Sequence, residues 1–338
     1  MILRKVVLLL FFLPAFVNAQ KVLKFSNEIE KMRIGGWHYN IDKVIDAREV
    51  SAPNFIGNVQ TGLVNSKRDA VLKRPLAEEL LPVVMQLLPE VDDTIELILK
   101  VNRMKVWEQT YFSTEEAYAF ADFDLILKKD SSFYRIDGYS DFIKYRSGWD
   151  VTGKHMSNIE TILRAALIHF ERKKAWTLPD SSLQKLDFEN LTKISKPQIL
   201  SEEKTKIGIY KHFGEFLTRN PTIPYLFEEK KGKKILVLTD NKGNKVSIKH
   251  PTDVWGFYDG EQIYICQEGS FFPVEITKKG IIKFKGYNVQ KKTRDMQTGA
   301  ILGGLIGAAI ASSITYDLEW MEINMNSGQV LPLKDSEK

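Results

Sequence analysis

The amino-acid sequence predicts an α+β fold, in which an antiparallel sheet with two helices on one face is followed by a mostly antiparallel β domain carrying one short glycine-rich helix. Three observations predict this class. Residues 76–88 and 157–170 repeat apolar side chains at helical spacing. The long runs around them alternate apolar and polar residues, as a strand buried on one face does. From residue 207 onward, short β-patterned runs are separated by turns.

The first half of the chain predicts the element order β-β-α-β-β-β-α. Its strands are expected at residues 39–50, 55–59, 94–107, 117–127 and 132–145. Pro75 should be the first residue of the first helix, Pro82 should kink that helix, and Pro89 should end it. Ser157 and Glu160 stand three residues apart as a capping box does, which predicts the start of the second helix.

Changes in composition divide the chain into parts. Residues 177–206 are rich in proline and serine and poor in aromatic side chains, which predicts a linker or a strap lying on the surface. The predicted parts are a signal peptide at 1–19, an α+β domain at 20–176, the linker at 177–206, and a β domain at 207–338 with a glycine-rich insertion at 296–315.

The first nineteen residues have the pattern of a cleaved secretory signal peptide. Arg4 and Lys5 precede an unbroken apolar run, and Val17 and Ala19 supply the small residues of a cleavage site. The run is too short to span a bilayer, although an uncleaved N-terminal anchor is the alternative. No cysteine stands at the expected cut, which excludes a lipobox. The pattern predicts an extracytoplasmic location, in the periplasm or outer envelope, after cleavage.

Composition argues against several classes of function. The basic surplus lies in residues 206–338, whose net charge of +4 is too small to indicate nucleic-acid binding. Cys266 is the single cysteine, so no intramolecular disulfide forms, and its β-patterned surroundings favour a structural role. The five histidines show no metal-ligand spacing, and no nucleophile or nucleotide-binding motif occurs. We therefore predict no catalytic residue, no metal and no cofactor.

Two carboxylates share one face of a predicted strand. Asp122 and Asp124 are two residues apart within the run at 117–127, so both side chains lie on the same side of the sheet. Such a pair could hold a cation. Pairing with lysine or arginine on a neighbouring strand is the favoured interpretation.

The element order over residues 38–173 resembles that of the auxiliary lipoproteins of Gram-negative envelope transport systems, the YajG-like and ABC-transport-auxiliary groups. The resemblance is carried by the strand end at residues 45–48, the run at residues 55–57 and the late amphipathic helix. The lipobox of those proteins is missing here. The resemblance implies an envelope location and a non-enzymatic accessory role.

Residues 299–311 form a glycine-rich apolar segment that interrupts the β pattern. Gly299, Gly303 and Gly307 are spaced by four and would share one face of a helix, while Leu305 would lie on another. Glycine costs roughly 1 kcal/mol relative to alanine within a helix. A row of glycines therefore favours close approach of a second backbone, and the segment resembles the glycine zippers of envelope proteins.

Three alternatives remain open for this segment. As a helix it would be about 20 Å long, which is short of the roughly 30 Å hydrocarbon core of a bilayer. It is a buried helix or loop of the β domain, an interfacial or oligomer-forming helix, or a membrane span. Lys291, Lys292 and Arg294 lie just before it and would either hold anionic lipid headgroups or form a solvated face.

The sequence thus favours an exported envelope protein with a non-enzymatic binding or assembly role, peripheral to a membrane through the glycine-rich segment. Its predicted partners are an envelope protein or a membrane surface, and a second copy of the chain is a further candidate. The predicted contact residues are Gly299, Gly303, Gly307, Leu305, Lys291, Lys292 and Arg294. The alternative is an exported hydrolase with its site between the two domains.

Overall fold

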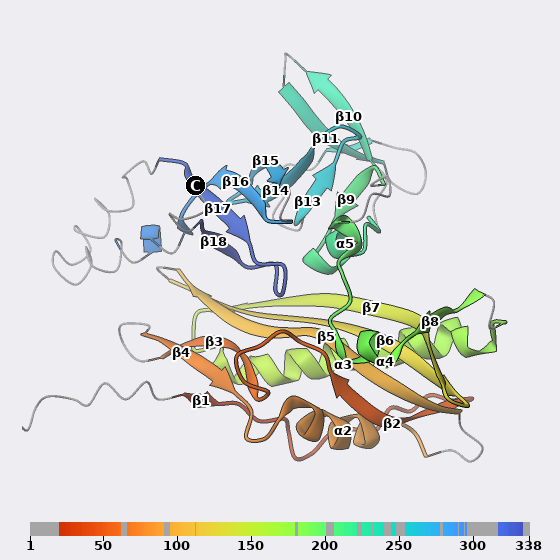
Figure 1. The fold of residues 1–338 in the computed structure, drawn as a ribbon. Helices are drawn as coiled ribbons and strands as arrows, with labels where there is room; N and C mark the ends of the chain where they lie inside the picture. The colour runs from red at the N-terminus through yellow and green to blue at the C-terminus, as the bar shows by residue number, and fades with distance from the viewer. Residues whose placement is uncertain are drawn as a thin grey trace, which may run out of the picture.

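The computed structural model describes most of the chain after the first nineteen residues. The described residues are 20–61, 66–90, 95–111, 113–179, 182–200, 206–221, 225–230, 233–239, 245–247, 254–277, 280–289, 291–293, 295 and 317–333. Within them, one large sheet lies above a layer of helices, and a second sheet lies over its other face (Figure 1). Most strand pairs are antiparallel, and the arrangement confirms the predicted α+β class.

The first sheet has eight strands in the described part of the chain. They are β1 (Lys21–Val22), β2 (Tyr39–Asp46), β3 (Phe55–Thr61), β4 (Ser66–Val71), β5 (Ile95–Thr110), β6 (Glu115–Lys129), β7 (Ser132–Ser147) and β8 (Gln184–Leu186). The order is β1-β4-β3-β5-β6-β7-β8, and β2 also pairs with β5. Strands β2 and β3 both pair with β5 in parallel, so one edge of this sheet is mixed where the sequence predicted only antiparallel pairing.

Two helices cover the same face of this sheet, as the sequence predicts. They are α2 (Leu76–Leu87) and α3 (His155–Lys173). Leu80 and Val84 of α2 and Leu163 and Phe170 of α3 belong to one hydrophobic core with the inward side chains of the strands. Burial of these apolar side chains at helical spacing is what fixes both helices to the sheet.

The ends of the two helices differ from the predictions. Pro75 occupies the N-cap of α2 rather than its first helical position. The predicted capping box of α3 is wrong, because a 3-10 turn at Thr152–Lys154 runs directly into the helix, which begins at His155. Ser157 is therefore already inside the first turn, and its hydroxyl donates to the carbonyl oxygen of Lys154 at 2.9 Å.

The second sheet is antiparallel and has seven strands among the described residues. In order along the sheet they are β18 (Val330–Pro332), β17 (Glu319–Ile323), β16 (Ile282–Gly286), β15 (Ser270–Ile276), β14 (Ile263–Gln267), β13 (Gly256–Tyr258) and β9 (Gly208–Tyr210). A short helix, α5 (Phe213–Leu217), follows β9. A separate three-stranded sheet contains β10 (Tyr225–Lys230), β11 (Lys233–Thr239) and β12 (Lys245–Ser247).

Strands β16 and β17 are neighbours, so residues 287–318 form a single connection between two paired strands. The glycine-rich insertion predicted at residues 296–315 falls within this connection, and it lies outside the described residues.

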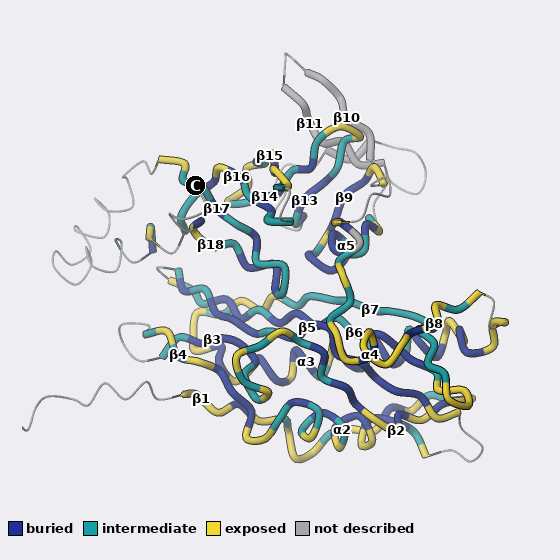
Figure 2. The backbone as a smooth tube through the Cα atoms, viewed as in Figure 1, coloured by how far each residue is buried: buried dark blue, intermediate teal, exposed yellow. Residues whose placement is uncertain are grey.

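The two sheets share hydrophobic contacts. The outward side chains of Trp107 on β5 and Phe120 on β6 belong to the core of the second sheet, together with Phe213 and Phe284. The rings of Phe120 and Phe213 are 5.1 Å apart. Strands β5 and β6 are consequently buried along most of their length, between the helices and the second sheet (Figure 2).

The segment that connects the two sheets lies along the first one. It contains β8, which pairs with β7, and α4 (Phe188–Thr192), whose Leu191 is buried. The ammonium of Lys100 donates to the carbonyl oxygen of Asn190 at 2.9 Å, and Arg219 donates to the carbonyl oxygen of Ile199 at 2.9 Å. Of the two alternatives for residues 177–206, these contacts favour a strap. We refer to residues 182–200 as the strap.

The strap covers the two carboxylates that the sequence placed on one strand face. Asp122 accepts from Arg103 of β5 at 2.5 Å, and Asp124 lies 2.6 Å from the Nε atom of Arg135 on β7. Each aspartate is thus paired with an arginine on a neighbouring strand, as predicted. Among the described residues, no group of three or more potential metal ligands is present.

Candidate functional site

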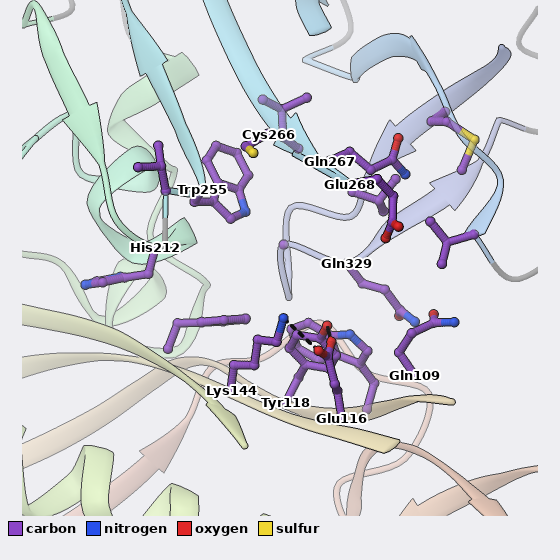
Figure 3. Close-up of a pocket in the computed structure, with 18 of the residues that line it drawn as sticks. Gln109, Glu116, Tyr118, Lys144, His212, Trp255, Cys266, Gln267, Glu268 and Gln329 are labelled. Carbon is purple, nitrogen blue, oxygen red and sulfur yellow. Dashed lines mark hydrogen bonds and ion pairs between the residues drawn. The ribbon is translucent and has the colours of Figure 1, made fainter. Parts of the chain in front are cut away.

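A cleft of about 740 Å³ lies between the outer face of the first sheet and the second sheet (Figure 3). One wall is built by the ends of β5, β6 and β7. The opposite wall is built by the segment before α5, by β14, and by the β17–β18 hairpin. The volume is that of pockets that hold small organic ligands, and such pockets occur preferentially between structural units.

Aromatic rings from three adjacent strands form one side of the cleft. Trp107 and Tyr118 are cross-strand partners, and their rings stack at 5.0 Å with planes only 5° apart. Phe142 on β7 packs 5.7 Å from both rings. On the opposite wall, Trp255 packs 4.6 Å from Phe216 of α5. The cleft is therefore bordered by rigid apolar surfaces on both sides.

A buried carboxylate lies beside these rings. The side chain of Glu116 is only 2% exposed, and its Oε1 atom is 2.8 Å from the ammonium of Lys144. The hydroxyl of Tyr118 donates to the other carboxylate oxygen, and burial raises the pKa of Tyr118 well above its usual value, so this donor keeps its proton. Arg146 adds positive charge 3.8 Å from the same carboxylate. The charge of Glu116 is thus balanced within the wall.

Two glutamines that line the cleft have side-chain amides with few hydrogen bonds among the described residues. Figure 3 shows the side chains of Gln109, from β5, and Gln329, from the turn before β18, approaching from opposite walls. Within the described residues, the side-chain amide of Gln329 makes no hydrogen bond, and that of Gln109 makes only a long one, at 3.4 Å to the carbonyl oxygen of Thr110. A side-chain amide both donates and accepts, so this pair can bond a group that does the same.

A third glutamine in the same wall shows such bonding within the chain. The side-chain amide of Gln267 donates to the carbonyl oxygen of Tyr287 and accepts from its backbone N–H, both at 2.7 Å. The side-chain amide of this glutamine therefore bonds both the N–H and the carbonyl oxygen of one residue's main chain.

The cleft also contains the single cysteine and a histidine. Burial raises the pKa of the Cys266 thiol to about 11, so the thiol is neutral at neutral pH. The Nε2 atom of His212 lies 3.5 Å from Asp141 and 3.7 Å from Glu215. Figure 3 shows its imidazole pointing away from Cys266. These orientations support the structural role that the sequence favours for the cysteine.

Two of the seven contact residues predicted from the sequence, Lys291 and Lys292, lie away from the cleft. Lys291 places its ammonium 3.2 Å from Glu319, and Lys292 lies in the same short helical turn. Neither lysine lines the cleft. The remaining predicted residues, Gly299, Gly303, Gly307, Leu305 and Arg294, lie outside the described residues. In the part of the chain that the structure describes, no helix is long and apolar enough to cross a membrane.

Apart from Cys266, the cleft residues were not singled out from the sequence. Trp107, Tyr118 and Phe142 do follow the strand alternation, so their placement on one face could have been predicted. Trp255 and Gln329 immediately precede β13 and β18, more than a hundred residues later in the chain. Nothing in a local pattern indicates that these later segments close over the first sheet.

No protein-family model matches the chain, and no curated protein matches its sequence. Among solved structures, a Xanthomonas campestris protein of the family-model DUF330 matches with a TM-score of 0.24 and 16% identity, over 47% of this chain and 91% of that one. A minor lipoprotein from Acinetobacter baumannii matches with a TM-score of 0.16 and 9% identity, over 30% of this chain and 76% of that one. These values do not assign the chain to a family.

Proposed function

We propose that this protein is a non-enzymatic, extracytoplasmic binding protein that holds a peptide segment of an envelope partner in the cleft between its two sheets. The signal-peptide pattern at residues 1–19 supports the location. The walls of the cleft come from the α+β domain and the β domain proposed from the sequence, residues 20–176 and 207–338.

The observation that carries the proposal is the facing pair of Gln109 and Gln329 beside aromatic walls. A peptide bond presents one donor and one acceptor, which two open amides can satisfy together. The rings of Trp107, Tyr118 and Trp255 would receive apolar side chains next to that backbone, as aromatic anchors do at interfaces.

The charge of the cleft indicates which segments it would prefer. Lys144, Arg146 and Lys211 line it, against two carboxylates, Glu116 and Glu268. Three cationic side chains against two carboxylates leave the lining with one net positive charge. The side chain of Arg146 is 60% exposed, so a ligand can reach it. We therefore expect the bound segment to carry an acidic residue beside an apolar one.

The alternative, an exported hydrolase with a site between the domains, would need a nucleophile held by a base within this cleft. The candidate bases of the cleft contact other groups than a nucleophile. Glu116 accepts from Tyr118 and pairs with Lys144, and His212 lies between Asp141 and Glu215. These pairings favour recognition over covalent chemistry.

The glycine-rich segment supplies a second proposed contact. Its sequence supports close packing against a membrane-bound partner or a second copy of the chain. The connection that contains it leaves one strand of the second sheet and returns on the next, because β16 and β17 are paired. Such a connection can extend from the sheet without interrupting it.

Photo-crosslinking in cells tests the proposed cleft. A benzophenone amino acid is placed at Gln329, and in a matched variant at Met85, which is 58% exposed on α2, beneath the opposite face of the first sheet. We expect Gln329 to form an adduct with a polypeptide of the envelope fraction and Met85 to form none. A polypeptide adduct at Met85 but none at Gln329 would contradict the proposal.

A binding measurement then tests the glutamine pair. The crosslinked segment is synthesised as a peptide and titrated while tryptophan fluorescence is followed, since Trp107 and Trp255 line the cleft. Gln329→Leu keeps the size of the side chain and removes its amide, so we expect affinity to fall about tenfold. Unchanged affinity in this variant would remove the glutamine pair from the recognition.

A further inference from the structure

A second, smaller hollow of about 190 Å³ lies where the β17–β18 turn meets β5 and the loop after β2. It shares no lining residue with the cleft. Its side chains are predominantly cationic or amide-bearing. The ones that the argument uses are Arg48, Glu49, Arg103, Lys105, Asn324 and Asn326.

Arg48 lines this hollow, and its guanidinium is bonded to other groups of the chain. Its side chain is only 2% exposed, and it bonds both carboxylate oxygens of Asp46, at 2.7 and 2.9 Å. It also donates to the carbonyl oxygens of Phe55 and Pro53, at 2.8 and 3.1 Å. These bonds hold the chain where β2 gives way to β3 alongside β5. Arg48 therefore shapes the hollow and keeps its own charge paired.

Arg103 is buried, and the Nε–H of its guanidinium has no partner among the described residues. The residue is 4% exposed, its Nη1 atom bonds Asp122 at 2.5 Å, and its Nη2 atom donates to the carbonyl oxygen of Ser195 at 2.9 Å. The Nε atom is buried without a hydrogen-bond partner among the described residues. An unsatisfied buried donor is costly, so a ligand oxygen at this position would be favourable.

Lys105 is two residues further along the same face of β5. Within the described residues, no ion pair or hydrogen bond of its ammonium is present. Burial lowers the pKa of this lysine, and the nearby charge of Lys67 lowers it further. Among the described residues, no carboxylate offsets either effect. A partly buried cation without a counter-charge destabilises the fold until an anion joins it.

The opposite side of the hollow presents amide groups. The Oδ1 atom of Asn324 accepts from the backbone N–H of Asn326 at 3.0 Å and from the hydroxyl of Ser327 at 3.2 Å. The acceptor of Asn324 is therefore used within the turn, and its amide N–H groups remain as donors. Glu49 also lines the hollow, but it is exposed at the rim.

We propose that this hollow binds a small oxyanion of the phosphate or sulfate class, held by Lys105 and Arg103 from β5 and by Asn324 and Asn326 from the β17–β18 turn. The volume suits a single phosphate group, and the donors outnumber the one carboxylate at the rim. Because its ligands come from both sheets, the anion would join the β17–β18 hairpin to the first sheet. Bound anion should therefore stabilise the whole chain.

Calorimetric and thermal titrations with inorganic phosphate test the proposal, with sodium chloride as the control at matched ionic strength. We expect phosphate, but not chloride, to bind and to raise the melting temperature. In Lys105→Met the phosphate-dependent rise should be lost, while stability without phosphate should stay equal or increase, because an unpaired cation is removed. Lys128→Met, at an exposed site on β6, should keep the full phosphate effect.

A second variant covers the case in which Lys105→Met fails to fold. Asn326→Asp places a carboxylate in the partly buried β17–β18 turn, where we expect it to abolish phosphate binding with an unchanged circular dichroism spectrum. A phosphate effect no larger than that of chloride, or one that persists in both variants, would overturn the proposal.

Vesicle binding distinguishes the two sources of a phosphate group. Phosphatidylcholine vesicles with and without phosphatidylglycerol are sedimented with the protein. Binding that needs phosphatidylglycerol, is competed by inorganic phosphate and is lost in Lys105→Met assigns the anion to a lipid headgroup. Binding of inorganic phosphate alone assigns it to a free anion.

Discussion

Ser195 donates its hydroxyl to Asp124 at 2.7 Å, which joins the strap to a strand 71 residues earlier in the chain. The backbone N–H of Ser195 donates to Asn102 at 3.0 Å, and its carbonyl oxygen accepts from Arg103 at 2.9 Å. Every polar group of this serine is thus bonded to side chains of the first sheet. Asp124 is also bonded by Arg135 on its other oxygen, so the serine completes an ion-pair network.

Ser195→Ala should loosen the strap. The change removes one donor from the buried Asp124, and we expect the free energy of unfolding to fall by about 1–2 kcal/mol. Limited proteolysis should cut residues 187–200 faster than in the wild type. Ser182→Ala is the control, because its hydroxyl makes only a local bond at an exposed position, to the carbonyl oxygen of Pro179. Equal cutting rates in all three proteins would instead favour a free linker.

Gly57→Ala should prevent normal pairing of β3 with β5. Gly57 has a φ of +144°, and a Cβ atom there would lie 1.9 Å from the carbonyl oxygen of Val106. Strain and overpacking each cost about 1–3 kcal/mol, so we expect a loss of about 2–6 kcal/mol in urea unfolding. Gly153→Ala should be close to neutral, because nothing lies within 4 Å of the added atom. A small loss at Gly57 would show that the strand can shift to accept the side chain.

Cys266 should react slowly with iodoacetamide in the folded protein. Its pKa is raised from 9.0 to about 11, so at pH 8 the thiolate fraction is about a hundredfold below that of the unfolded chain. Because the folded state holds the proton more tightly, this thiol stabilises the fold below pH 9 and loses that contribution as the pH rises toward 11. The check is the alkylation rate with and without urea. Similar rates in the two conditions would show that the thiol is accessible and normally acidic.

Gly303→Leu tests the glycine-rich segment, whose interpretation rests on the sequence alone. If the glycine face packs against another backbone, the added side chain should cost about 1–3 kcal/mol at that contact. Leu305→Ser on the other face is the companion change. Loss of association with an unchanged melting temperature supports an interface, and loss of stability alone supports a buried segment. No effect from either change would exclude the segment from function.

The sequence predicted the elements with strong periodicity and missed those without it. The apolar spacing of α3 identified the helix, but Ser157 and Glu160 misplaced its start because the preceding 3-10 turn shows no sequence pattern of its own. Strand β4 was missed, since its first four residues, 66–69, are all polar and lie at most partly buried. The cleft could not be predicted, because docking of the second sheet depends on contacts between segments far apart in the chain.

The core that Trp107 and Phe120 share with the second sheet implies an order of folding. Strands β5 and β6 are synthesised more than a hundred residues before β14, β16 and β17, which later cover their outer face. Until then, the second sheet does not cover the aromatic side chains of that face. They form a transiently exposed hydrophobic surface that is prone to aggregation. Among the described residues, those two side chains are also part of the core of the second sheet. The C-terminal half thus packs onto a surface that the N-terminal half provides. Because the two halves share this core, the chain should unfold as one cooperative unit.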